Sequence, residues 1–312
     1  MSSASTLQQM YQQMLEIRLI EEELLLAVND GRVIGSTHLC IGQEAIPVGA
    51  CAALGATDPV IATYRGHGWA LSRGVPPDQL IGEIFGRDSD LNGGRAGSAY
   101  LSAPQYGFFG ENSIVGAGVP VALGLALACS RTDADRLPLV SIGDGAMNQG
   151  NVHESLNMSS VLNLPMIVVV ENNGYVEMTP SSTLTAVPAA SRASAYAIEA
   201  LEVDGNDPEA VRDAVSDARR RALAGSRPVL VEAHTRRLGG HYSGDAQQYR
   251  PAGEIDEWRL TDPLEQAHSK LSPEASARAE SEARAVVAAA FAQAELMPQP
   301  DPQKVMTHVF AE

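Results

Sequence analysis

The chain has 312 residues, of which 45% are hydrophobic and 19% charged, and this composition excludes a disordered protein. Its formal net charge of −16 is opposite in sign to that of a typical nucleic-acid or anionic-membrane binder, so we expect neither activity. The three cysteines form no CxxC pair and the first thirty residues carry charges throughout, so we expect a cytoplasmic protein without disulfides, zinc site, signal peptide or membrane span.

The N-terminal third predicts mostly helices and loops. Residues 5–29 carry apolar side chains at helical spacing and predict a helix. Residues 59–63 predict a short buried strand, and the prolines at the start of 76–85 predict a second helix. The segment 87–113 is rich in Gly, Ser and Asn without a period, which predicts a long loop. Residues 112–130 contain no charge, and we expect there a loop that leads into a buried helix.

The central and C-terminal parts predict alternating strands and helices. The expected strands are 137–142, 166–171, 198–203 and 228–233, and the expected helices are 150–162, 206–225 and 272–296. Continuous apolar strands that bracket helices indicate parallel β-α-β units buried on both faces. We therefore expect one doubly wound α/β domain over residues 1–312, a mainly parallel sheet with helices on both faces. It consists of an N-terminal helix (5–29), a core (about 30–237), a lid loop (about 238–252) and a C-terminal helical extension (about 253–312).

Two polar motifs follow neighbouring strands of this predicted sheet. Gly143-Asp144-Gly145 comes after the first central strand and Asn172-Asn173-Gly174-Tyr175 after the second. The carboxyl ends of parallel strands are where open α/β sheets bind ligands. A carboxylate, an amide oxygen and a backbone carbonyl can supply three oxygen ligands to Mg²⁺ and leave positions for phosphate oxygens and water. Either motif alone is more often a turn, but together they predict a metal–diphosphate site.

Further motifs occur in a fixed order along the chain. They are HLCIGQEA (38–45), YRGHG (64–68), IVGA (114–117), GDGAMNQG (143–150), ENNGY (171–175), and Gly240-His241 followed by Tyr249-Arg250. Together they resemble the α subunit of the thiamine diphosphate-dependent first component of acetoin and 2-oxo acid (pyruvate) dehydrogenase complexes. The resemblance covers roughly residues 5–265 and implies a thiamine diphosphate-binding fold with Mg²⁺ as the metal.

The resemblance also implies roles for individual residues. The implied cofactor contacts are Tyr64, Arg65, Ser113, Val115, Asp144, Gly145, Ala146, Asn173, Tyr175 and His241. Among them, Asp144, Asn173 and the carbonyl of Tyr175 match the Mg²⁺ ligands. His38 and His241 match histidines on the substrate side, and we predict that both are catalytic. A lone histidine more often satisfies a local hydrogen bond, but these two stand inside matched motifs.

Differences within the family bear on the substrate. Tyr242 stands where pyruvate dehydrogenase α subunits have a regulatory serine, and Tyr100 replaces a usual histidine. The runs GDAQ (244–247) and ENNGYVE (171–177) resemble the acetoin branch. We therefore expect a larger pocket with aromatic walls and acetoin as the substrate, with pyruvate or another 2-oxo acid as the alternative.

The chain carries only half of the site that thiamine catalysis needs. The residues after 235 offer no room for a second α/β domain, so the resemblance implies a β subunit that supplies the activating glutamate, in an assembly of two α and two β chains. The acyl unit would pass to a lipoyl-bearing acyltransferase. Two alternatives stay open: transfer to a non-lipoyl acceptor in a biosynthetic pathway, and a non-catalytic regulatory subunit on the same fold.

Overall fold

The computed structural model describes residues 6–133 and 135–307 and is built around a six-stranded sheet with the order β2-β1-β3-β4-β8-β7, in which every pairing is parallel. The strands are β1 (Val60–Thr63), β2 (Phe108–Asn112), β3 (Leu139–Gly143), β4 (Ile167–Asn172), β7 (Glu199–Asp204) and β8 (Val229–His234). A small antiparallel hairpin joins β5 (Tyr175–Val176) to β6 (Thr179–Pro180). The predicted doubly wound, mainly parallel α/β fold is confirmed.

Helices cover both faces of this sheet. They are α1 (Leu7–Asn29), α2 (Ala45–Ala53), α3 (His67–Ser72), α4 (Pro77–Ile84), α5 (Gly118–Thr132), α6 (Gly150–Val161), α7 (Ala189–Ala193), α8 (Pro208–Gly225), α9 (Glu254–Arg259), α10 (Pro263–Ser269) and α11 (Pro273–Leu296). The buried side chains of α2 and α8 belong to one core cluster, and those of α5, α6 and α7 belong to a second.

Alternating side chains of the strands produce these two cores. On β4, Ile167 and Val169 point into the core that α2 and α8 cover, whereas Val168 and Val170 point into the opposite one. All four are fully buried. A strand buried on both faces needs apolar residues at every position, which explains the continuous run of Ile and Val in the sequence.

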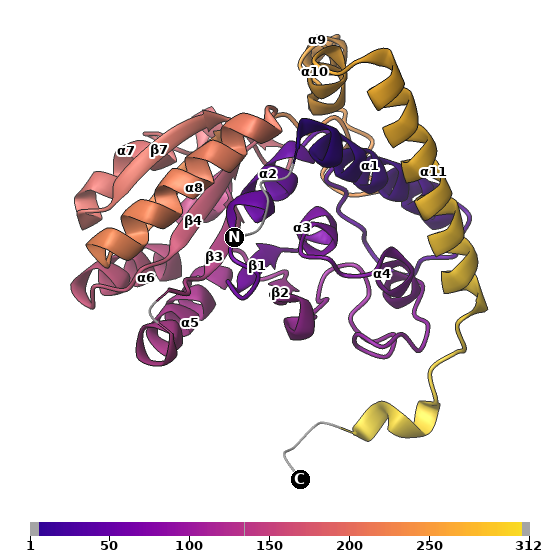
Figure 1. The fold of residues 1–312 in the computed structure, drawn as a ribbon, viewed down its shortest axis with the longest axis horizontal. Helices are drawn as coiled ribbons and strands as arrows, with labels where there is room; N and C mark the ends of the chain where they lie inside the picture. Colours follow the sequence, from indigo (N-terminus) through magenta and orange to yellow (C-terminus); the bar gives the residue numbers. More distant parts are fainter. Residues whose placement is uncertain (1–5, 134, 308–312) are drawn as a thin grey trace.

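The two terminal helices pack against each other at the side of the molecule opposite β7 (Figure 1). Thr6 starts α1 with a capping box, in which its hydroxyl accepts from the Gln9 amide and the Gln9 side chain accepts from the Thr6 amide. Ser272 caps α11 through the Ala275 amide at 3.2 Å. Small side chains such as Ala283 form the buried face of α11 and allow close packing.

The structure differs from the sequence-based prediction in several places, among them β2, α2 and α5. The expected loop 87–113 ends in β2, which forms by pairing with β1 although its sequence is short and half polar. Helix α2 was not expected, because residues 45–50 are buried all round and so show no amphipathic period. Helix α5 is not a buried helix: Val121 is 50% exposed and Leu127 36% exposed on its outer face.

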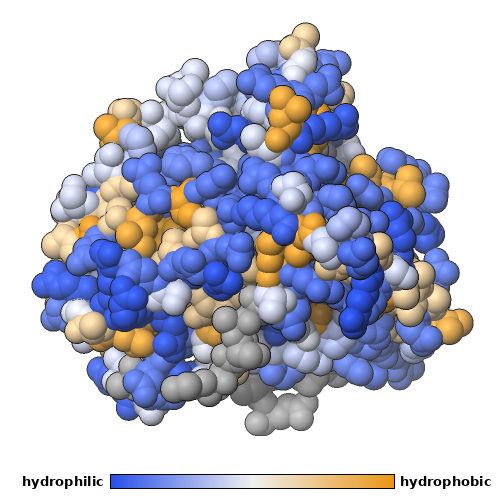
Figure 2. Space-filling view, turned by 45° about the horizontal axis from the view of Figure 1, so that its top comes forward, coloured by the Kyte–Doolittle hydropathy of each residue, from blue (hydrophilic) through white to orange (hydrophobic). Residues whose placement is uncertain are grey.

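The surface is mostly hydrophilic. Hydrophilic residues cover most of the face shown in Figure 2, with hydrophobic residues in small groups between them. Within residues 6–133 and 135–307, no helix combines the length and the apolar character that crossing a membrane requires.

Candidate functional site

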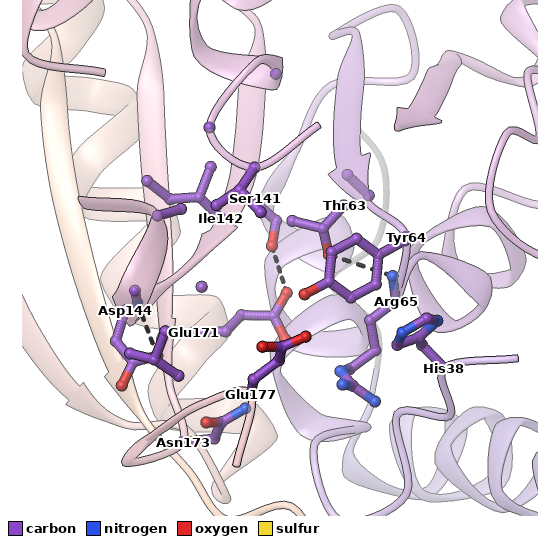
Figure 3. A pocket seen from close by; sticks show the side chains of 18 of the residues that line it. His38, Thr63, Tyr64, Arg65, Ser141, Ile142, Asp144, Glu171, Asn173 and Glu177 are labelled. Atoms are coloured by element: carbon purple, nitrogen blue, oxygen red, sulfur yellow. Dashed lines mark hydrogen bonds between the residues drawn. The ribbon is translucent and has the colours of Figure 1, made fainter. Parts of the chain in front are cut away.

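A cavity of about 440 Å³ lies at the carboxyl ends of β1, β3 and β4. The structure brings all the predicted site residues to its lining: His38, Tyr64, Arg65, Ser113, Val115, Asp144, Gly145, Ala146, Asn173, Tyr175 and His241. In Figure 3, Asp144 and Asn173 lie on one side of the cavity, and Tyr64, Arg65 and His38 lie on the other. The roles of these residues stay predictions, but their convergence follows from the parallel topology, which directs all strand ends to one edge.

Asp144 is the residue whose environment points most directly to a cation. It follows β3, and its Oδ1 accepts from the Gly145 amide at 3.0 Å. Its other carboxylate oxygen, Oδ2, is buried and has no hydrogen-bond partner among the residues that the structure describes. Burial raises the pKa of Asp144 to about 6, against the lowering effect of the nearby Ser181 hydroxyl and the Gly145 amide. An unpaired buried carboxylate oxygen is costly, and a bound cation would remove that cost.

Asn173 and Tyr175 belong to the turn after β4. The Asn173 Oδ1 accepts from the Tyr175 amide at 3.1 Å, and the Asn173 Nδ2 donates to Gln43 Oε1 at 3.1 Å. Gly174 takes a φ of +81°, which glycine adopts without strain and which allows the turn. Nowhere in the described chain do three His, Cys, Asp or Glu side chains form a metal cluster. One carboxylate, one amide oxygen and one carbonyl are instead an oxygen donor set suited to Mg²⁺.

Two buried arginines give the cavity a positive region. Arg65 donates to the backbone carbonyls of Leu39 and His241. Arg237 is 1% exposed, and burial together with the charge of Arg65 lowers its pKa to about 10. Among the described residues, neither guanidinium forms an ion pair with a carboxylate. Buried charges without counterions favour an anionic ligand, and a guanidinium fork fits a phosphate well.

Three rings lie together in the same cavity. The His38 ring centroid is 4.4 Å from that of Tyr64 and 5.0 Å from that of His241. Burial, followed by the charge of Arg65, lowers the pKa of His38 to about 3 and that of His241 to about 4. The Nδ1 of His38 is buried without a partner. Both imidazoles are therefore neutral near pH 7, and each can accept a hydrogen bond at one ring nitrogen.

A glycine is needed at position 145 for packing within the protein, apart from the cofactor contact that its motif implies. A Cβ on this residue would come within 2.6 Å of Val176 Cγ1 on β5. The glycine thus allows the β5–β6 hairpin to pack against the turn after β3. Gly143, by contrast, has open space around the position of a Cβ. Of the two glycines, only Gly145 is required by the packing of the protein itself.

The expected lid, residues 238–252, contains no helix or strand and is held by side-chain contacts. The Arg250 guanidinium lies 5.1 Å from the Tyr175 ring and 4.9 Å from the Trp258 ring, and it pairs with Glu254 at 2.9 Å. Asp245 accepts from the His241 amide at 2.6 Å. These contacts connect the segment to the turn after β4 and to α9.

Three residues with clear places in the cavity received no role from the sequence: Gln43, Glu171 and Arg237. Gln43 and Glu171 stand inside the motifs GQEA and ENNGY, so the motifs themselves were a usable signal. Arg237 stands four residues before His241 and follows β8, another strand of the same sheet, which is the signal that could have found it.

Comparison with known proteins identifies the family. A family model described as dehydrogenase E1 component matches residues 12–303. The alpha subunit of acetoin:2,6-dichlorophenolindophenol oxidoreductase from Cupriavidus necator is 37% identical over 98% of this chain and 94% of its own length. The same subunit from Bacillus subtilis is 42% identical over 78% of this chain and 74% of its own length. The pyruvate dehydrogenase E1 component subunit alpha of Rhizobium meliloti is 36% identical over 96% and 88%. The chain therefore belongs to the dehydrogenase E1 component family of thiamine diphosphate-dependent oxidoreductases, as its sequence motifs predict.

Proposed function

We propose that this chain is the α subunit of a dehydrogenase that cleaves acetoin, using thiamine diphosphate and Mg²⁺, and passes the acyl unit to a lipoyl group. The observation that carries the proposal is the cavity itself. It combines the buried Oδ2 of Asp144, which has no hydrogen-bond partner among the described residues, with two buried arginines that form no ion pair with a described carboxylate. A diphosphate bound through Mg²⁺ satisfies both at once, since the cation neutralises the carboxylate and the phosphates neutralise the guanidiniums.

The donor set fits the metal and the diphosphate. Asp144, Asn173 and the carbonyl of Tyr175 would hold Mg²⁺, and Arg65 and Arg237 would bind the phosphates. When bound, thiamine diphosphate supplies a carbanion that attacks a substrate carbonyl carbon. The contribution of this chain is to bind and orient the diphosphate and to exclude water from it.

The two neutral histidines are suited to proton movement. With pKa values lowered to about 3 and 4, the imidazoles of His38 and His241 are neutral and weakly basic at pH 7. The negative charge of a bound diphosphate would raise both pKa values toward neutrality, where an imidazole exchanges protons with a substrate hydroxyl best. Acetoin carries such a hydroxyl next to its carbonyl. The carboxylate that activates the cofactor would come from a β subunit, and two α and two β chains would form the enzyme.

The outer faces of α5 and α6 support a β subunit as the partner. Val121 on α5 is 50% exposed, and on α6 Met158 is 50% and Val161 69% exposed. These two helices contact each other, so the exposed apolar residues lie on adjacent elements. Both helices begin directly after cavity loops, so this surface belongs to elements whose first turns adjoin the site, although Met158 and Val161 lie at the far end of α6.

Of the two tyrosines on which the expected aromatic pocket for acetoin depends, only one lies beside the cavity. Tyr242 lies beside the cavity, with its ring centroid 6.4 Å from those of His38 and His241. Tyr100, however, is 59% exposed and lines a separate surface hollow with Arg95 and Lys304. Tyr100 lies outside the cavity lining, as does the rest of the segment 87–100.

Arg237 favours a second candidate, a 2-oxo acid such as pyruvate. Its guanidinium lies 3.4 Å from the His241 Nδ1 and could pair with a substrate carboxylate. The deciding experiment measures kcat/KM of the assembled enzyme for acetoin and for pyruvate with an artificial electron acceptor. A higher value for acetoin supports the proposal, and a preference for pyruvate overturns it in favour of the second candidate. Replacing the artificial acceptor with a lipoyl domain then tests the acceptor.

A further inference from the structure

The carboxylate of Glu171 lies at the carboxyl end of β4 and accepts hydrogen bonds from three other elements. The Trp69 indole on α3 donates to it at 2.8 Å, the Gln43 amide before α2 donates at 2.9 Å, and the Ser141 hydroxyl on β3 also donates (Figure 3). Glu171 is 7% exposed. The three donors oppose the rise in pKa that burial causes at Glu171, and in its ionised form the carboxylate acts only as an acceptor.

This carboxylate begins a chain of hydrogen bonds that ends at a proposed metal ligand. Gln43 donates its Nε2 to Glu171 and accepts, at Oε1, from the Nδ2 of Asn173 at 3.1 Å. The Oδ1 of Asn173 accepts from the Tyr175 amide. Each side-chain amide has one donor end and one acceptor end, so fixing the first amide fixes the next.

We propose that Glu171 and Gln43 are positioning residues that fix the orientation of the Asn173 amide, so that its oxygen and not its nitrogen is offered to the metal. The inference rests on the proposed function of the cavity. Because Glu171 can only accept, Gln43 must direct its NH₂ group toward Glu171 and its oxygen toward Asn173. Asn173 must then direct its NH₂ group toward Gln43, which leaves Oδ1 on the other side. Rotating either amide would put two donors or two acceptors in contact.

A neighbouring pair provides a matched control. On β8, Glu232 is 1% exposed and its Oε1 accepts from the Nδ2 of Asn172 at 2.7 Å. Asn172 precedes Asn173 but lies outside the cavity lining. Glu171→Gln and Glu232→Gln thus each remove one buried negative charge from a carboxylate that accepts from a side-chain amide, that of Gln43 or that of Asn172. Only the first change reverses the direction of the hydrogen-bond chain to Asn173.

The experiment measures the Mg²⁺ concentration at half-saturation by calorimetry, at fixed thiamine diphosphate, in the enzyme assembled with its β subunit. In Glu171→Gln, the new NH₂ group turns Gln43 around, and Asn173 then presents its nitrogen. We expect this variant to need at least about 10-fold more Mg²⁺ than Glu232→Gln.

A double variant tests the direction of the chain itself. In Gln43→Glu/Glu171→Gln, the glutamine at 171 still accepts from Trp69 and Ser141 and donates to the glutamate at 43, which accepts from Asn173. We expect half-saturation within about threefold of the wild type, because the Asn173 orientation is restored. If this variant does not fold, Gln43→Met decides, since it removes the acceptor for Asn173 and should weaken Mg²⁺ binding as Glu171→Gln does.

Each result has a defined meaning. Equal Mg²⁺ requirements in Glu171→Gln and Glu232→Gln overturn the inference, as does a folded double variant without recovery or a Gln43→Met variant that binds like the wild type. A wild-type enzyme that binds no Mg²⁺ overturns the proposed function, and the inference with it. Normal Mg²⁺ binding in the wild type with no difference among the variants overturns the inference alone.

Discussion

The Arg65 guanidinium donates to the backbone carbonyl of His241 at 2.9 Å. The arginine, on the segment after β1, is therefore held by the main chain that follows β8 and does not depend on the imidazole of His241. His241 therefore contributes to the cavity in two separate ways, through its backbone carbonyl and through its ring. In the proposed function, the main chain of His241 would fix the Arg65 cation for the diphosphate, and its ring would stay available for proton transfer.

This separation predicts the effect of removing the ring. His241→Ala should lower kcat by about 100-fold or more, because a neutral imidazole beside the substrate is lost. Thiamine diphosphate affinity should fall by less than about tenfold, since Arg65 keeps its backbone acceptor. Steady-state kinetics and calorimetry on the assembled enzyme measure the two effects. Arg65→Lys is the matched comparison and should weaken cofactor binding more than it lowers kcat. Equal losses of affinity in both variants contradict the division of tasks.

The metal ligands can be ranked by charge. Asp144→Ala removes the one carboxylate of the proposed set and should weaken Mg²⁺-dependent thiamine diphosphate binding by at least about 100-fold. Asn173→Ala removes a neutral ligand and should act in the same direction with a smaller effect. Asp144→Asn keeps the size of the side chain and should resemble Asp144→Ala if charge is the cause. Calorimetric titration with Mg²⁺ is the measurement, and unchanged affinity in Asp144→Ala would remove this residue from the site.

Assembly should depend on the surface formed by α5 and α6. The chain purified alone should bind thiamine diphosphate weakly and show no turnover, and co-expression with the β subunit should yield two α and two β chains. Val161→Glu places a charge on the exposed face of α6 and should shift the protein toward unassembled chains, seen by light scattering after gel filtration. Leu296→Glu, at a 77% exposed residue of α11, is the control and should assemble normally. Thiamine-dependent activity of the chain alone would refute the need for a partner.

A buried histidine away from the cavity predicts how stability changes with pH. His67 lies 3.1 Å from Glu21 Oε1 and 2.9 Å from the Ser98 hydroxyl. Burial alone would lower its pKa, but the charge and hydrogen bond of Glu21 outweigh burial and raise it to about 9. A folded-state pKa above the ordinary 6.5 stabilises the protein fully below pH 6.5, and this stabilisation is lost as the pH rises through 9.

His67→Gln removes this titration. The difference in melting temperature between the wild type and His67→Gln should therefore be largest near pH 6 and shrink toward pH 9.5. Burial also raises the pKa of Glu111 to about 8, and the charge of His67 lowers it. The two titrations are coupled, so the difference between the two proteins reports the His67–Glu111 pair together. Scanning calorimetry at a series of pH values gives the comparison. A difference that stays constant with pH would show that His67 does not hold its proton in this way.

The site could be predicted from the sequence because its residues follow strands with a strong local signal. Strand β4 is a run of Ile and Val that cannot be a surface segment, and the polar residues after it must lie at the sheet edge. Strand β2 has no such signal, because Gly110 takes a φ of +136° and Glu111 is buried among neighbours that pairing alone supplies. Its existence depends on β1, which lies more than forty residues earlier.

The roles of Glu171 and Gln43 were beyond sequence reasoning for a related reason. The two residues are 128 positions apart, and their hydrogen bond exists only once β4 and the segment before α2 have been brought together. Both residues stand in recognisable sequence motifs, but the sequence does not show which side-chain amide donates to which acceptor. Arg237 was visible in the same way, and only the fold shows that it is buried without a carboxylate partner.

The pairing of α1 with α11 has a consequence for how the chain is made. The Tyr11 hydroxyl donates to Glu280 at 3.2 Å across 269 residues of sequence. While the protein is being synthesised, the first helix leaves the ribosome long before the helix that covers it exists. Met10 and Met14, fully buried in the finished fold, then have no final packing partner from α11. At elongation rates of about 5–20 residues per second, that interval lasts on the order of ten seconds or more, a period in which other apolar surfaces compete for α1.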